Sequence, residues 1–104
     1  MKIIKYIVSA AAALAVTASA GYAADPAQGL ALSQRWCAAC HVVSADQKEA
    51  STDAPPFSTV ARSPHFSVRG LAYFLLDPHP KMPDLPLSRQ AADDIAAYIA
   101  TLRN

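Results

Sequence analysis

The strongest periodic pattern of apolar residues lies near the C-terminus, between Ser88 and Arg103. Apolar positions recur there at spacings of three and four, which is the pattern of an α-helix with one buried face. These positions are Ala91, Ile95, Tyr98, Ile99 and Leu102. Ser88 can cap the start of this helix, and Arg103 suits its negative C-terminal end. The pattern therefore predicts a helix over residues 88–103 that packs against a core.

Three earlier segments also predict helices. Asp25 as a cap and Pro26 at the first helical position open the first one, which carries Trp36. A short second helix is expected over residues 57–62 and a third over residues 67–76, which ends because a residue before proline avoids the helical region. The apolar face of the third helix consists of Leu71, Phe74 and Leu75. Together these segments predict an all-α fold, a bundle of about four helices.

Gly29 falls inside the first predicted helix, where glycine costs about 1 kcal/mol relative to alanine. Such a glycine often allows the close approach of another helix, but it can also be a tolerated weak point. Both explanations stay open from the sequence.

Two connecting segments have different characters. Residues 42–54 are polar and predict a surface loop with no chemistry of its own. Residues 77–86 contain four prolines, which exclude the interior of a helix or a sheet. Prolines also stiffen a loop by restricting its unfolded conformations. A stiff loop of this kind can present one side chain at a fixed point.

The N-terminal segment has the pattern of a secretory signal peptide. Lys2 and Lys5 precede an apolar run over residues 6–18, and small residues follow, including Gly21 and Ala23. We therefore expect residues 1–23 to be removed after export and residues 24–104 to form the single domain. An uncleaved membrane anchor is the alternative, but the apolar run is short.

Removal of this segment changes the charge and size of the domain. Nine basic and eight acidic residues give the full chain a charge of +1; without Lys2 and Lys5 it is −1. This balance has none of the basic excess that nucleic-acid binding requires. A domain of this size buries a small core and usually needs an additional constraint.

The motif Trp36-Cys37-Ala38-Ala39-Cys40-His41 supplies the candidate chemistry. Two cysteines two residues apart, with a histidine directly after, have the spacing of covalent c-type haem attachment. On a helix, residues three and four apart share one face. That arrangement would direct both thiols to the vinyl groups of one porphyrin and the imidazole to its iron. Because export leads to an oxidising compartment, the thiols must stay reduced until haem is attached.

Three other uses of this motif deserve comparison. A thioredoxin-like redox pair occurs within an alternating strand–helix pattern, which the sequence lacks. A structural zinc site needs four ligands, and only the distant His65 and His79 remain as candidates. A structural disulfide between Cys37 and Cys40 would constrain little. Covalent haem is therefore the favoured interpretation.

Further residues can complete a haem site. Met82 is the only methionine after residue 23, and it lies in the proline-rich loop. Its thioether is the favoured second axial ligand, because His/Met ligation is the arrangement of cytochromes c; His79 and His65 are the rivals. A carbonyl of the Pro55-Pro56 pair could accept the Nδ1 proton of His41 and orient its ring. The two prolines could also simply end a loop.

The order of these motifs resembles that of small bacterial class I c-type cytochromes. The motifs are Cys-Ala-Ala-Cys-His, Ala-Pro-Pro-Phe, Pro-Lys-Met-Pro and Asp-Ile-Ala-Ala-Tyr-Ile-Ala-Thr-Leu, and the resemblance extends over essentially all of residues 24–104. The resemblance implies one haem c wrapped by the helices, with thioether bonds at Cys37 and Cys40. It implies His41 and Met82 as axial iron ligands and the Pro55 carbonyl as the partner of His41.

The resemblance also concerns helix packing, and the chain departs from it in two places. It implies that Gly29 lets the first helix cross the last one beside Tyr98. The proline is doubled, so Pro56 could carry the role of Pro55. Ala91 stands where relatives often have an acid, which weakens the capping of the last helix.

The expected function is single-electron transfer by a periplasmic monohaem cytochrome that is not an enzyme. Six-coordinate iron leaves no open position for a substrate. Expected partners are redox proteins: a membrane quinol-oxidising cytochrome complex, a terminal oxidase or a periplasmic dehydrogenase. We expect no nucleic-acid partner, no membrane span after signal cleavage, and a monomer. The alternatives are a haem subunit of a periplasmic dehydrogenase complex and a haem-based gas or redox sensor.

Overall fold

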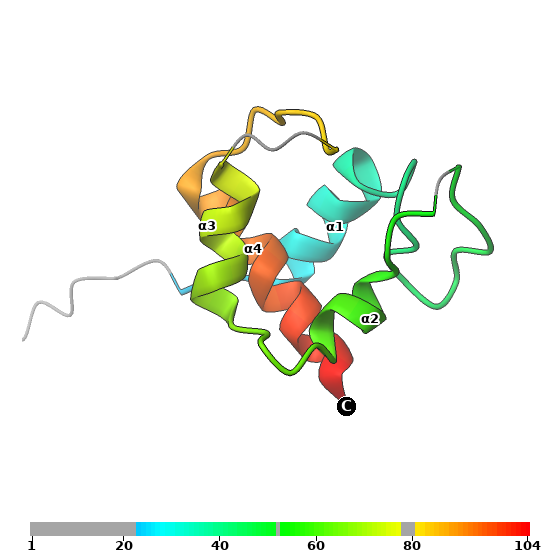
Figure 1. The fold of residues 1–104 in the computed structure, drawn as a ribbon. Coiled ribbons are helices and arrows are strands. Elements are labelled where there is room, and N and C mark those ends of the chain that lie inside the picture. Colours follow the sequence, from blue (N-terminus) through cyan, green and yellow to red (C-terminus); the bar gives the residue numbers. More distant parts are fainter. Residues whose placement is uncertain (1–22, 52, 78–80) are drawn as a thin grey trace, which may run out of the picture.

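The computed structural model describes residues 23–51, 53–77 and 81–104, and these ranges contain four α-helices and a terminal 3-10 turn, with no β-strand (Figure 1). The elements are α1 (Pro26–Trp36), α2 (Phe57–Ala61), α3 (Val68–Leu76), α4 (Arg89–Ala100) and η1 (Thr101–Arg103). The predicted all-α fold with about four helices is confirmed. The predicted signal peptide lies almost wholly outside the described residues and stays a prediction.

Side-chain caps define where three of the helices begin. The Asp25 carboxylate accepts hydrogen bonds from the backbone at the start of α1, and Pro26 takes the first helical position. Ser67 accepts from Gly70 N–H in α3, and Ser88 accepts from Ala91 N–H in α4. Each cap satisfies a donor that a helix start leaves without a partner. The predicted cap at Ser88 therefore forms although Ala91 is not acidic.

The C-terminal boundaries of two predicted helices were slightly too long. α2 ends at Ala61, and Arg62 is its capping residue. The predicted helix over residues 88–103 is α4 followed by the tighter turn η1. The last turn of a helix often tightens because its final carbonyl groups have no partner one turn ahead.

α1, the cyan helix in Figure 1, packs against the orange helix α4. Gly29 lies at the crossing. A Cβ atom added at Gly29 would lie 1.9 Å from the Asp94 carbonyl oxygen and 2.8 Å from the Tyr98 Cβ atom. No side chain fits between backbones this close. The Ser33 hydroxyl, also buried, donates to the Gly29 carbonyl over 2.7 Å. Close helix approach, one of the two explanations left open by the sequence, is therefore the correct one.

A buried carboxylate joins the start of α1 to α4. The Asp94 side chain is 4% exposed and accepts a hydrogen bond from the Asp25 backbone N–H over 2.8 Å. The Gln90 side-chain amide donates to the same oxygen, also over 2.8 Å. Two donors offset part of the cost of removing this group from water. The beginning of α1 is thus anchored one turn from the crossing.

α4 packs against two different parts of the protein. Ile95, Tyr98 and Ile99 join a core with Val43 and Phe57, which come from the segments around the cysteine motif. A second face packs on α3 through three small side chains: Ala72, Ala92 and Ala96. The predicted apolar face of the last helix is therefore confirmed at its centre. One helix supports the motif and α3 at the same time.

Gly29→Ala is expected to lower the free energy of unfolding by about 1–3 kcal/mol, the usual cost of overpacking. The added methyl group would overlap the Asp94 carbonyl and force α1 away from α4. Chemical denaturation followed by circular dichroism measures the loss. Gly70→Ala is the comparison at an exposed site, because its added methyl group would meet only the Ser67 hydroxyl and any cost is limited to the cap of α3. Equal stabilities of the Gly29→Ala variant and the wild type would contradict a tight crossing.

Candidate haem site

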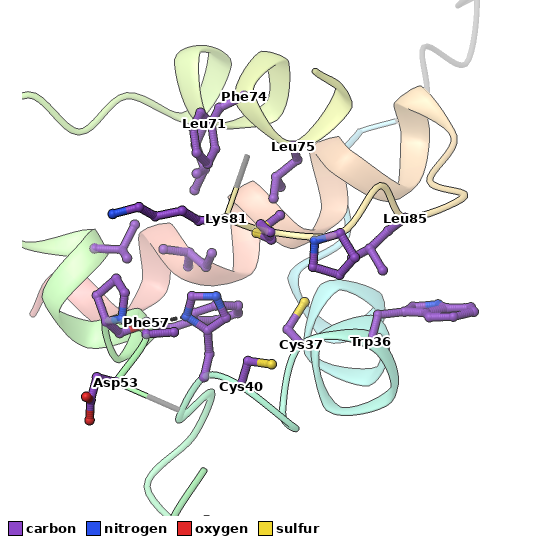
Figure 2. A pocket seen from close by; sticks show the side chains of 17 residues that line it. Trp36, Cys37, Cys40, Asp53, Phe57, Leu71, Phe74, Leu75, Lys81 and Leu85 are labelled. Atoms are coloured by element: carbon purple, nitrogen blue, oxygen red, sulfur yellow. Dashed lines mark hydrogen bonds between the residues drawn. The ribbon is translucent and has the colours of Figure 1, made fainter. Parts of the chain in front are cut away.

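A cavity of about 680 Å³ opens between α3, the proline-rich loop and the cysteine motif (Figure 2). Its volume falls in the range of roughly 300–1,000 Å³ typical of ligand and cofactor sites. Cys37, Cys40, His41 and Met82 all line this cavity. The structure therefore brings together four residues that the sequence predicted as one site, from two segments far apart in the chain.

The opposite wall of the cavity is apolar. Leu71, Phe74 and Leu75 of α3 face the side that carries Cys37 and Cys40, as Figure 2 shows. These three residues are the predicted apolar face of the third helix. Phe74 remains 49% exposed, whereas Leu71 and Leu75 are half-buried. The apolar face of α3 thus contributes mainly to the wall of the cavity, while Ala72 packs on α4.

The cysteine motif lies in turns after α1, whereas the sequence interpretation placed it on a helix. Cys37 is the C-cap of α1, and the N–H groups of Cys37 and Ala38 both donate to the Ser33 carbonyl. This shared acceptor widens the last turn and ends the helix. The His41 N–H still donates to the Cys37 carbonyl over 2.9 Å, a spacing of four residues. The motif therefore keeps one helix-like turn, which brings both thiols and the imidazole to the same cavity.

The two cysteines are not joined by a disulfide. Burial, and secondarily the nearby Cys40, raises the pKa of the Cys37 thiol to about 11. Cys37 is therefore a neutral thiol at pH 7. A reactive redox cysteine has a lowered pKa, whereas the environment of Cys37 raises it. Among the residues of the described ranges, no group of three or more His, Cys, Asp or Glu side chains could hold a metal ion.

The His41 ring is held by a backbone carbonyl and an aromatic neighbour. Its Nδ1 atom lies 2.7 Å from the Pro55 carbonyl oxygen, which can only accept a hydrogen bond. Nδ1 therefore carries the proton, and Nε2 is left with a lone pair suited to a metal ion. The centroids of the His41 and Phe57 rings are 5.2 Å apart.

Pro55 and Pro56 have separate tasks in the structure. The Pro56 carbonyl accepts hydrogen bonds from Thr59 and Val60 in the first turn of α2. Pro56 is the N-cap of α2, so its carbonyl is directed along that helix. The Pro55 carbonyl, one residue earlier, is the one within hydrogen-bonding distance of His41.

Of the two rival ligands, the structure describes His65, which is placed differently from Met82. Met82 is half-buried at the cavity, next to the exposed Lys81. His65 is exposed between α2 and α3 and does not line the cavity. His79 lies outside the described residues.

The loop after the motif has a larger role than the sequence interpretation gave it. Val43 is 1% exposed, and its carbonyl accepts a hydrogen bond from the Tyr98 hydroxyl of α4. Gln47 donates to the Ala38 and His41 carbonyls. The expectation of a mere surface loop was therefore wrong for these residues. The apolar pair Val42-Val43 directly after His41 was the available sequence signal for the buried position; nothing local marks Gln47.

Similarity to a known protein identifies the family of this chain. No protein-family model matches the chain, and no solved structure matches it. The chain is 58% identical over 91 residues to cytochrome c-552 of Bradyrhizobium diazoefficiens, an alignment that covers 88% of each protein. The chain belongs to the small class I c-type cytochromes.

The cavity of this cytochrome fits the group that defines its family, a covalently bound haem c with iron. The cysteine motif contributes two thiols and an imidazole with a free Nε2, the proline-rich loop contributes a thioether, and α3 contributes apolar side chains. This is the donor set that a porphyrin with two vinyl groups and one iron requires. The family transfers electrons between redox proteins. Within the described part of the chain, no helix has the length and apolar character needed to cross a membrane.

Tyr98→Phe is expected to lower the free energy of unfolding at pH 7 by about 1–3 kcal/mol. The variant leaves the buried Val43 carbonyl without its hydroxyl donor. Thermal or chemical denaturation measures the effect, and Tyr73→Phe is the matched control because Tyr73 is 63% exposed.

The difference in stability between the wild type and Tyr98→Phe should depend on pH. Burial, followed by the negative charge of Asp46, raises the pKa of Tyr98 above its ordinary value of 10.0. A raised pKa favours the neutral phenol in the folded state. Its stabilising contribution is therefore full below about pH 10 and is lost as pH rises through the raised pKa. A difference between wild type and Tyr98→Phe that grows with pH in this range would contradict the assignment.

Proposed function

We propose that this cytochrome is a periplasmic single-electron carrier with one haem attached in the cavity described above. The observation that carries the proposal is the convergence of Cys37, Cys40, His41 and Met82 on one cavity. In this proposal the cysteine thiols form thioether bonds with the haem vinyl groups. His41 Nε2 and the Met82 sulfur take the two axial positions of the iron.

The protein residues would control the chemistry that the bound haem supplies, which is reversible one-electron transfer. The Pro55 carbonyl holds the Nδ1 proton of His41, which fixes the ring and makes Nε2 a stronger donor. A thioether at the other axial position favours ferrous iron and raises the potential. The apolar side chains of α3 exclude water from one side of the site. With both axial positions occupied by protein, no position remains for a substrate, which supports a carrier rather than an enzyme.

The proposed location rests on the N-terminal segment. Two lysines, an apolar run and small residues before position 24 support export and cleavage after Ala23. Residues 24–104 would then form a monomeric carrier of charge −1. Its partners would be a membrane quinol-oxidising complex, a terminal oxidase or a periplasmic dehydrogenase. Weak, brief encounters suit such a carrier, because each partner must release it after one transfer.

Covalent attachment can be tested by acid–acetone extraction of the exported protein. Iron ligation does not survive the extraction but thioether bonds do, so the haem should stay with the polypeptide. Mass spectrometry should place it on the peptide that contains Cys37 and Cys40. The double variant Cys37→Ala, Cys40→Ala should hold no haem covalently. Ala39→Ser, at an exposed position between the two cysteines, is the control that should keep it. A colourless extracted wild type would refute the proposed site.

Met82→Ala should abolish the weak absorption band at long wavelength that marks methionine-ligated ferric haem. The midpoint potential should fall, because the ferrous state loses the thioether that favours it. The reduced variant should also bind carbon monoxide, which a stable methionine ligand resists. His65→Ala is the control and should leave the spectrum and the potential unchanged, since His65 lies away from the cavity. A wild type without this band, whose spectrum and potential Met82→Ala leaves unchanged, would assign the sixth position to another residue.

A further inference from the structure

Gln47 makes hydrogen bonds to backbone groups on both sides of the His41 position. Its Nε2 atom donates to the Ala38 and His41 carbonyls, each over 2.8 Å. A third contact of 3.1 Å reaches the Glu49 carbonyl, and Oε1 accepts from the Val43 N–H over 2.9 Å. The side chain is half-buried. One amide group is therefore bound to three residues of the segment 38–43.

The orientation of this amide follows from its partners. A backbone N–H can only donate and a carbonyl can only accept, so the oxygen must face Val43 and the nitrogen must face the carbonyls. The nitrogen has two hydrogens, and the two shorter bonds, to Ala38 and His41, account for both. A flipped amide would place acceptor against acceptor and donor against donor. No other rotation of the group satisfies these contacts.

These bonds hold the part of the backbone that the haem site depends on. Ala38 directly follows Cys37, and His41 directly follows Cys40, so fixing both carbonyls fixes the turn that separates the two thiols. The carbonyls of Ala39 and Val42, in the same segment, accept hydrogen bonds from other residues, each of which bonds to one of them. Ser51 donates to Ala39 with its N–H and its hydroxyl, and Phe57 N–H donates to Val42.

Gln47 differs from these other anchors because it spans the motif. Tyr98, for example, reaches the same segment from α4 but bonds only to the Val43 carbonyl. Gln47 instead bonds to three backbone positions between Ala38 and Val43.

We propose that Gln47 is a positioning residue for the haem site. Its amide holds the turn from Cys37 to His41 in the shape that two thioether bonds and an axial histidine require. Gln47 does not line the cavity, so it acts through the backbone carbonyls and touches no reacting atom. The inference rests on the proposed attachment of haem at Cys37, Cys40 and His41.

Three variants separate hydrogen bonding from other roles of this side chain. Gln47→Ala removes the amide and the space that it fills. Gln47→Met keeps the length and most of the volume of the side chain but removes every hydrogen bond of the amide. It should therefore match the wild type only if the role of Gln47 is to fill space. Lys48→Ala is the control, because it changes an exposed neighbour in the same loop.

The measurements use the exported ferric protein with its haem. The His41 amide donates to Cys37 and not to Gln47, so its hydrogen exchange reports on the turn itself. We expect exchange at His41 to be about five- to tenfold faster in Gln47→Ala and Gln47→Met, the factor for one lost hydrogen bond. Amides in the middle of α4 are the internal reference and should keep their rates. The haem methyl resonances, whose pattern follows the orientation of the axial histidine ring, should shift in both variants.

The possible outcomes decide between the two proposals. Faster His41 exchange and shifted haem methyl resonances in both Gln47 variants, with α4 and Lys48→Ala unchanged, support the inference. Wild-type values in Gln47→Met would overturn it in favour of packing, and equal acceleration at His41 and in α4 would overturn it in favour of general stability. A wild-type protein with no covalent haem would refute the attachment site and this inference together. If the wild type carries covalent haem and Gln47→Met has the same exchange rate and haem methyl resonances, the inference alone is refuted.

Discussion

The contact between Gly29 and α4 determines where the cysteine motif can lie. With only a hydrogen atom at this position, the backbone of α1 reaches the Asp94 carbonyl. The buried Ser33, one turn later, ends the helix by accepting two N–H groups at its carbonyl. Cys37 follows directly and is 7% exposed. Because the helix is short and anchored at its start by Asp94, a shift at the crossing would be carried along α1 to the thiol.

α4 then connects this end of the molecule with the other walls of the cavity. Tyr98 holds the Val43 carbonyl from one face, while alanines on another face pack against α3. Small side chains bring α3 close to α4 and direct its larger apolar residues to the cavity. A domain this small has little core of its own. A covalent haem against these residues would supply apolar surface that the chain does not provide.

The sequence predicted the helices well because their signals are local. Caps such as Ser88, a proline at the first position and apolar spacings of three and four depend on nearby residues. The attachment motif was equally visible, since its chemistry needs a fixed spacing. Gln47 was missed because a glutamine in a polar loop looks like any solvated residue, and its partners are defined only after the loop folds back. Asp94 was missed for the same reason. α4 has two adjacent acids, Asp93 and Asp94, and only the packing of α1 determines which of them is buried.

The choice between Pro55 and Pro56 could not be made from the sequence, because each supplies one carbonyl and no N–H. It depends on where α2 begins: the Pro56 carbonyl is used by the first turn of the helix, which leaves that of Pro55 for His41. The same helix start directs the Phe57 N–H to Val42 and its ring to His41. The start of α2 therefore restrains the histidine in three ways: by a hydrogen bond to its ring, by a hydrogen bond to the carbonyl of the next residue, and by an aromatic contact.

The two proposed axial ligands are held in physically different ways. His41 lies in a backbone whose carbonyls accept hydrogen bonds from Gln47, Phe57 and other groups, so its position is fixed by contacts made in the folded state. Met82 lies in a loop in which prolines restrict the backbone before folding, and a bond from Leu87 N–H to the Leu85 carbonyl closes its end. The contacts of His41 fix the orientation of its ring as well as its position. An imidazole needs both, because its lone pair is directional. A thioether sulfur tolerates more rotation about its own bonds, so a stiff backbone that delivers the sulfur to the cavity is sufficient.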